Sequence, residues 1–218
     1  MKAGMLALLC ASLALPQAAA AQQRSDCELH VWTTNAYAAV YHGAEVGPGP
    51  GEGGYSVTTY LARMEPIRKR LADAIDETVQ ADAIRAMTLG TQGRFAGYRL
   101  IFHTAPAQAK YSNWTDKNVG AGGRDTDSTS SCYAELHTVF IALFRTAISK
   151  KIQTGFLFRD FGANPTVTFG IADASSTGAA AFKTNDEEKS DAARSDLRAA
   201  FQENLRIFLR KKKMMPRR

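Results

Sequence analysis

The sequence predicts an α+β fold, with an antiparallel or mixed sheet of about four to five strands and two amphipathic helices packed on one face. Two long segments, 61–87 and 186–213, repeat apolar residues at helical spacing. Shorter segments alternate in polarity or are rich in β-branched and aromatic residues. A strand, a helix, a run of strands and a closing helix therefore follow one another along the chain.

The first strand is expected in CELHVWTT, residues 27–34. Leu29 and Val31 would point to one face of the sheet, and the polar and aromatic residues between them to the other. Residues 36–43 are expected to extend this strand after a break, and a loop rich in glycine and proline follows at 43–55.

Residues 61–87 are expected to form one helix. Ile67, Leu71, Ile75 and Val79 fall at three- and four-residue spacing and make one apolar stripe. Pro66 suits the first turn of such a helix, where its missing amide hydrogen is not needed.

Four further strands are expected after this helix, at 97–103, 132–148, 151–162 and 165–173. The second and third would form a hairpin that turns near Ser149 and Lys150. Pro165 places the last strand at an edge of the sheet, because proline cannot donate to a neighbouring strand. The polar segment 104–131 is expected to be a long loop, a kind of segment that is often functional.

The closing helix is expected at 186–213, with an apolar stripe that must lie on the sheet. The stripe consists of Leu197, Ala200, Phe201, Leu205, Phe208 and Leu209.

Residues 1–21 have the features of a cleavable secretory signal: Lys2, a short apolar run, and alanines before the expected cut. The apolar run is too short to span a bilayer, and no later segment is suited to do so. We therefore expect one domain, residues 22–218, in a periplasmic or secreted protein with no transmembrane segment after cleavage.

Cleavage would remove Cys10 and leave Cys27 and Cys132, an even count that favours a disulfide in an oxidising compartment. The bridge would close a loop of about 100 residues, for which the chain-entropy model gives at most about 4.7 kcal/mol. Two free thiols or metal ligands are the alternatives, although no Cys-x-x-Cys pair is present.

The net charge of +6 is concentrated at the C-terminus. Within the basic tail 210–218 and just before it, the cations are Arg206, Arg210, Lys211, Lys212, Lys213, Arg217 and Arg218. The first five are candidates to bind an anionic lipid surface or an envelope protein partner, and we do not expect a nucleic acid. The alternative is a solvated helix end, which cations also favour.

A metal site is the sharpest chemical hypothesis. Glu28 and His30 lie two residues apart, as do Glu135 and His137, so each pair shares one face of a strand. A disulfide would hold the two strand starts together, and two histidines with two carboxylates could bind a transition metal. The alternative is two polar outer faces.

Other motifs carry no activity. The RDFG at 159–162 lacks the remaining kinase motifs, and no G-x-S-x-G is present. The G-x-G-x-x-G at 49–54 is interrupted by prolines and opens no helix. We therefore expect no catalytic residue and no cofactor.

The segments CELHVW, GYRLIFH, SCYAEL and FRDFG, with the closing helix, resemble a group of uncharacterised exported bacterial proteins. The element order over roughly 27–213 is similar to that of the TolB N-terminal domain, the curli-secretion lipoproteins and LptE. This resemblance implies a non-enzymatic periplasmic module that binds or assembles components of the envelope. The alternative is an exported metal-dependent enzyme or metal carrier that uses His30 and His137.

Overall fold

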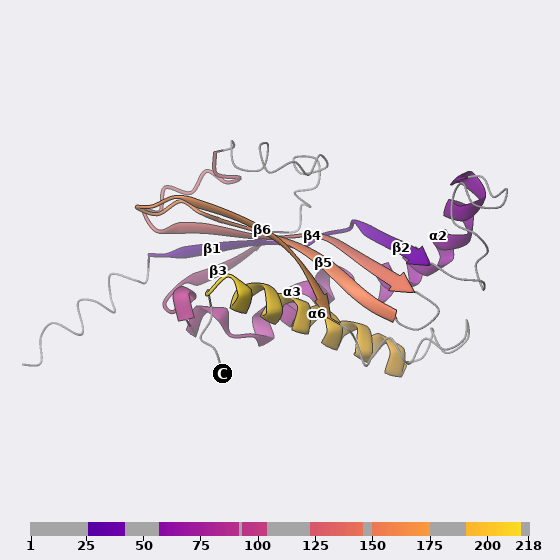
Figure 1. Ribbon diagram of the computed structural model, residues 1–218. Helices are drawn as coiled ribbons and strands as arrows, with labels where there is room; N and C mark the ends of the chain where they lie inside the picture. Colours follow the sequence, from indigo (N-terminus) through magenta and orange to yellow (C-terminus); the bar gives the residue numbers. More distant parts are fainter. Residues whose placement is uncertain are drawn as a thin grey trace, which may run out of the picture.

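The structure is a computed structural model that describes residues 26–41, 57–91, 93–103, 123–145, 150–174 and 191–214. The predicted signal 1–21, most of the predicted loop 104–131 and the last four residues of the basic tail lie outside these ranges. Within them, three α-helices cover one face of a six-stranded mixed sheet (Figure 1). The predicted α+β class is confirmed, with slightly more strands than expected.

The sheet has the order β3-β1-β4-β5-β6, with β2 paired to the far half of β4. Its strands are β1 (Glu28–Trp32), β2 (Tyr37–Tyr41), β3 (Arg99–His103), β4 (Tyr133–Arg145), β5 (Lys150–Asp160) and β6 (Thr166–Ala174). β1 runs parallel to both β3 and β4, β2 runs parallel to β4, and β4, β5 and β6 are antiparallel neighbours. β6 is an edge strand of this sheet, as Pro165 predicts.

The first predicted helix is two helices. α2 spans Val57–Ala74 and α3 spans Glu77–Ala86. Asp76 separates them because its carboxylate accepts a hydrogen bond from the Val79 amide at 2.8 Å and so begins α3. Pro66 is inside α2 rather than in its first turn, since α2 begins several residues earlier than expected.

The core lies between the helices and the sheet. α6 (Asp191–Lys211) buries the predicted stripe, and Phe201, Leu205 and Leu209 are fully buried. Short 3-10 turns at Leu89–Thr91 and Gly93–Phe95 add Leu89 and Phe95 to the same cluster. Each large side chain buried in this way stabilises the fold by about 1.5–3 kcal/mol. No helix in the described ranges is both long and apolar enough to cross a bilayer.

A bulge in β4 changes which side chains face the helices. The register with β5 shifts between Thr138 and Phe140. Before this point Leu136 enters the helix-covered core, and after it Ile141 does, although the two residues differ in parity. One strand can therefore present a polar row beside β1 and still fill the core beside β2.

Gln80 of α3 holds the link between β1 and β2 beside this bulge. Its amide is fully buried, accepts from the Thr34 amide at 2.9 Å and donates to the Thr34 carbonyl at 2.8 Å. The Thr34 hydroxyl donates to the Val139 carbonyl in the bulge at 2.9 Å. One side chain thus joins a helix, a strand connection and the bulge.

We expect Gln80→Leu to lower the free energy of unfolding by about 2–3 kcal/mol, because it removes the two buried hydrogen bonds that Gln80 makes with the Thr34 amide and carbonyl. Urea unfolding followed by circular dichroism measures this loss. Gln202→Leu on the half-exposed part of α6 is the matched control and should change stability by less than about 0.5 kcal/mol. Equal stability of the two variants would contradict the assignment.

Candidate functional site

The sheet face opposite the helices is polar and aromatic at the β3-β1-β4 end. In register, Glu28 lies beside Tyr133, His30 beside Glu135, and Trp32 beside His137. Neighbouring residues in register share a face, so both predicted Glu-x-His pairs are on this one face. His30, Glu135 and His137 are buried there rather than on a solvated surface.

Cys27 and Cys132 form a disulfide, as predicted, with their Cα atoms 4.5 Å apart. The two cysteines stand one position before the first β1–β4 pair, Glu28 and Tyr133. The Glu28 amide also donates to the Cys132 carbonyl at 2.8 Å. The covalent bond and the hydrogen bond together fix the register that builds the polar face.

Glu28 and His30 form a first cluster with His103 of β3. The Glu28 carboxylate accepts hydrogen bonds from the Ser128 hydroxyl and from His30 Nε2 and pairs with Arg99, which lowers its pKa to about 2. Because this carboxylate is ionised and only accepts, the hydrogen of a neutral His30 is on Nε2. His30 Nδ1 then accepts from His103 Nε2 at 2.7 Å.

Glu135 is the centre of a second cluster. Its carboxylate accepts from the Tyr133 hydroxyl and the Asp125 amide, each at 2.7 Å, and from His137 Nε2 at 3.2 Å, and it pairs with Arg159. Burial alone would raise the pKa of Glu135, but these donors and the guanidinium outweigh burial and lower it. Glu135 is therefore a fully bonded carboxylate.

The four predicted metal ligands do not form one site. His30 bonds to Glu28 through one ring nitrogen and to His103 through the other, whereas Glu135 and His137 group with Asp125. Asp125, Glu135 and His137 offer atoms that all lie within 4.8 Å of one another. Arg159 already supplies a cation to this group, because its Nη2 is 2.7 Å from Asp125 and also pairs with Glu135.

Trp32 lies between two histidines on this face. Its ring is stacked on those of His103 and His137, with both centroid distances at 4.3 Å. Burial lowers the pKa of His137 and that of His103, and the nearby histidines lower the pKa of His103 further. Both rings are thus favoured in the neutral form, which suits packing against an indole.

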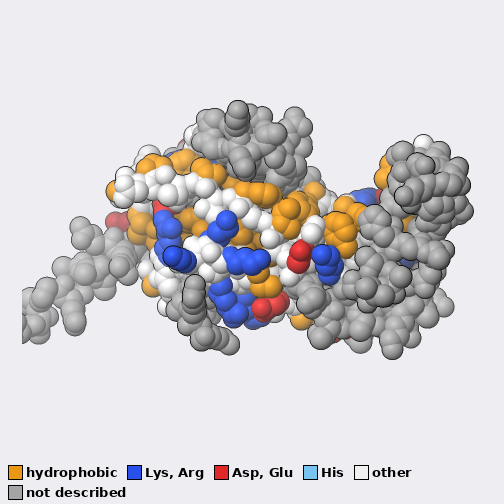
Figure 2. Space-filling view, in the orientation of Figure 1, with side chains coloured by type: hydrophobic (Ala, Val, Ile, Leu, Met, Phe, Trp, Pro, Cys, Tyr) orange, Lys and Arg blue, Asp and Glu red, His pale blue; other side chains and the backbone are white. Residues whose placement is uncertain are grey.

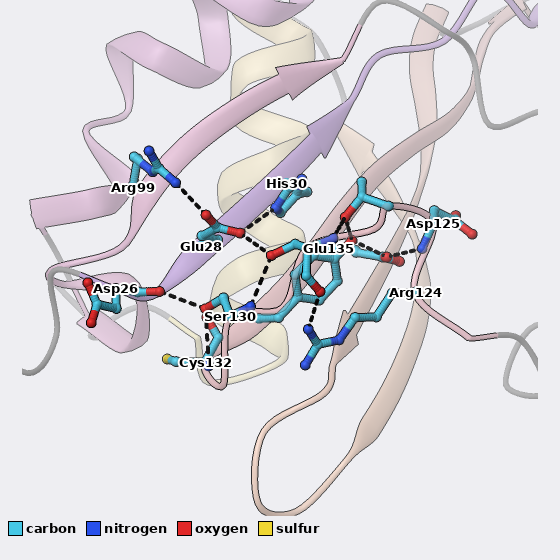
Figure 3. A network of polar contacts seen from close by, with 12 residues as sticks. Asp26, Glu28, His30, Arg99, Arg124, Asp125, Ser130, Cys132 and Glu135 are labelled. Carbon is cyan, nitrogen blue, oxygen red and sulfur yellow. Dashed lines mark hydrogen bonds and ion pairs between the residues drawn. The ribbon is translucent and has the colours of Figure 1, made fainter.

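The segment 123–131, the described part of the predicted long loop, crosses this face and joins the polar network around Glu28 and Glu135 (Figure 3). An open groove lies beside it. The groove has a volume of about 820 Å³, and its lining includes Asp26, Glu28, Asp127 and Arg99. Carboxylates outnumber the guanidinium, and many hydroxyls complete the lining. The groove therefore suits a neutral polar or cationic group better than an anion.

The predicted anion-binding cations are held on the end of α6, not on a free tail. α6 ends at Lys211, and the chain is then fixed because the Met214 amide donates to the Leu209 carbonyl at 2.9 Å. Lys213 has a φ of 55°, a left-handed conformation that usually requires glycine. Lysine and arginine side chains gather over α6 on the face shown in Figure 2.

Arg206 pairs with Glu203 at 3.4 Å. The other four candidates, Arg210, Lys211, Lys212 and Lys213, form no ion pair with any residue that the structure describes. Lys211, Lys212 and Lys213 are exposed. They are therefore available to an anionic partner.

Several important residues were not among the predicted site residues. Asp125 lies in an irregular segment, and Arg159 belongs to the RDFG sequence, which by itself predicts no activity. Arg159 meets Glu135 because the β4–β5 register pairs the two residues, and Asp125 meets it because its backbone amide donates to the Glu135 carboxylate. His103 could have been found from the sequence. It is the last residue of a predicted strand that alternates in polarity, as does the strand that contains His30.

No protein-family model matches the chain, and neither does any curated protein. A solved structure of a hypothetical protein from Chlamydia trachomatis is similar over 86% of this chain and 96% of that one. The identity is 13% and the TM-score is 0.28, a value too low to support an inference about fold or function.

We expect stability to fall as the pH falls from 7.5 to 5.5. His137 and His103 have lowered pKa values in the folded protein, so the unfolded chain binds more protons below its ordinary pKa of 6.5. Each histidine that stays neutral in the folded protein lowers the free energy of unfolding by about 1.4 kcal/mol between pH 7.5 and pH 5.5. Glu28 adds a second loss of stability between pH 4.5 and about 2. Its carboxylate stabilises the fold through its hydrogen bonds and ion pair only while it is ionised, and its pKa is lowered to about 2 in the folded protein.

Urea unfolding at pH 8.5, 7.5 and 5.5 measures the histidine contribution, and His137→Gln should remove about half of the change between the two lower values. Asp125, Glu135 and Arg159 face this ring in both proteins, so the substitution leaves its charged surroundings the same. Between pH 8.5 and 7.5 the free energy of unfolding should be nearly constant. A wild-type protein with equal stability at 7.5 and 5.5 would contradict the burial of neutral histidines.

Proposed function

We propose that the protein is a non-enzymatic, envelope-associated binding or assembly module, exported to the periplasm or secreted, that contacts an anionic lipid surface through the end of α6. The observation that carries this proposal is a run of four cations without ion pairs to described residues, Arg210–Lys213, at the C-terminal end of α6 and in the turn that follows it. Each cation near an anionic membrane contributes about 1 kcal/mol.

The conformation of Lys213 supports this role. A left-handed backbone costs a residue other than glycine about 1–2 kcal/mol, so lysine is a poor choice for stability at this position. Met214, the next residue, is buried and holds the turn against the core. A lysine at a position that favours glycine supports the proposal that its charge has a use beyond folding.

The site geometry gives little support to an enzyme. On the polar face, the carboxylates Glu28 and Glu135 are each bound by several donors from the protein itself. Such carboxylates anchor the segment 123–131 to the sheet. The resemblance of the element order to small envelope modules is consistent with a binding role for the protein.

We expect Lys213→Gly to stabilise the protein by about 1 kcal/mol and yet to weaken its binding to anionic vesicles about fivefold. Sedimentation with vesicles that contain phosphatidylglycerol, against pure phosphatidylcholine, measures the binding, and urea unfolding measures stability. A variant that is more stable but binds less cannot owe its loss to misfolding.

Lys69→Gln is the matched control for this experiment, because it removes one exposed cation from α2 and should leave vesicle binding within twofold. Wild-type binding should weaken as salt is raised. Undiminished binding by Lys211→Gln/Lys213→Gly, or equal binding to neutral vesicles, would exclude the lipid contact.

A metal carrier or metal-dependent enzyme is the second candidate. The proximity of Asp125, Glu135 and His137 favours it, and the guanidinium of Arg159 within the same group opposes it. Two carboxylates that already share a cation attract a metal ion less strongly than two free ones. His30 belongs to the neighbouring cluster and would not be a ligand of this group.

We expect purified protein to contain less than about a tenth of an equivalent of zinc or copper, and to show no thermal shift when either metal is added. Arg159→Gln should instead gain a zinc-dependent thermal shift, because it leaves three possible ligands without their cation. Stoichiometric metal in the wild-type protein would contradict this expectation and support the metal carrier or metal-dependent enzyme.

A further inference from the structure

β6 is an edge strand whose protection against pairing is confined to its two ends, at Pro165 and Asp173. Among the described residues it pairs only with β5, so the outer hydrogen-bonding groups of its backbone face no strand there. It is nine residues long and its register with β5 is continuous. Its one charged residue, Asp173, is next to its last position and pairs with Lys151, so the seven residues 166–172 carry no charge. Natural edge strands are usually short, bulged or charged, and an edge without these features is a template for another strand.

One face of this edge is apolar. Val167, Phe169 and Ile171 share the sheet face opposite the helices, and Val167 and Ile171 are 45% and 47% exposed. Phe169 packs beside the buried Leu157. Figure 2 shows a band of hydrophobic side chains along the upper edge of the molecule, with lysine and arginine side chains below it.

The other face of the edge is cationic. Gly170 has no side chain, and α6 therefore approaches β6 closely: a Cβ at this position would lie 3.1 Å from Phe208 and 3.4 Å from Cε of Lys212. The Lys212 side chain thus lies over the helix-facing side of the edge strand, at the basic end of α6. A strand added to β6 would meet apolar side chains on one face and positive charge on the other.

We propose that β6 binds an extended segment of a partner protein as an added strand, in which apolar residues alternate with aspartate or glutamate. Alternate side chains of a strand point to opposite faces, so the apolar residues would pack on the Val167–Ile171 stripe and the acidic ones would approach Lys212. The inference deepens the proposed function and rests on it, since it gives the binding module a protein partner.

A second copy of the chain fits this edge less well. Antiparallel pairing of two β6 strands about Phe169 would place Val167 opposite Ile171, which matches the apolar stripes. The same two-fold axis would bring two Lys212 side chains and two basic helix ends to one face without a counter-charge. Charge complementarity therefore favours an acidic partner strand.

The test uses the full chain and a labelled peptide of about ten residues in which valine and isoleucine alternate with glutamate. A second peptide carries lysine in place of glutamate. Fluorescence anisotropy should show that the wild-type protein binds the glutamate peptide at least tenfold more tightly than the lysine peptide. Ile171→Lys should weaken binding of the glutamate peptide at least tenfold.

Lys212→Glu should weaken binding of the glutamate peptide and strengthen binding of the lysine peptide, each at least threefold, a reversal that misfolding cannot produce. Leu61→Lys is the matched control, since Leu61 is another exposed large apolar residue, 60% exposed on α2, and its loss should leave both affinities unchanged. Unchanged binding by Ile171→Lys, or no preference between the peptides, would overturn the proposal. So would a concentration-dependent dimer of the wild-type protein that Ile171→Lys abolishes in sedimentation velocity.

Vesicle sedimentation separates this inference from the proposed function. Ile171→Lys should bind anionic vesicles as the wild-type protein does, while losing the peptide. Failure of peptide binding with vesicle binding intact would reject only the added strand. Failure of vesicle binding in the wild-type protein would reject the lipid contact instead.

Discussion

The parallel pairing of β1 with β4 is the constraint on which the polar face depends. The Cys27–Cys132 disulfide stands one position before the pair Glu28 and Tyr133 and fixes which residues lie side by side. Because side chains alternate along a strand, a slip of one residue would turn either row to the other side of the sheet. Histidine, tryptophan and glutamate would then enter the helix-covered core, and leucine and valine would leave it. The register is therefore what separates a polar layer from an apolar one.

The polar layer is held together by hydrogen bonds and ion pairs between groups of the protein. Glu135 gathers donors from β4, from β5 and from the segment 123–131, so one carboxylate holds three parts of the chain together. Burial of charge is expensive unless it is paired, and Arg159 provides the pairing. The resulting sheet has an apolar interior on one side and an ion-pair network on the other. The partner contacts that we propose lie at its margins, at the end of α6 and along β6.

Local patterns in the sequence were enough to predict the strands, the α6 stripe and the disulfide, because each follows from alternation, helical spacing or cysteine count. The break before α3 was missed, since Asp76 acts as a cap only when the chain turns there. The site was predicted in part. The pairs Glu28–His30 and Glu135–His137 do share a face, but their separation into two clusters depends on Arg159 and His103. Those partners come from strands whose register no local pattern specifies.

The bulge at Thr138–Phe140 also has an evolutionary consequence. It adds one residue that lets Leu136 and Ile141 enter the same core despite their odd spacing. Loss of a single codon there would restore strict alternation and exchange the buried and outward rows of half the sheet. Homologous chains should therefore tolerate insertions and deletions in the connections between elements far better than in this short stretch of a central strand.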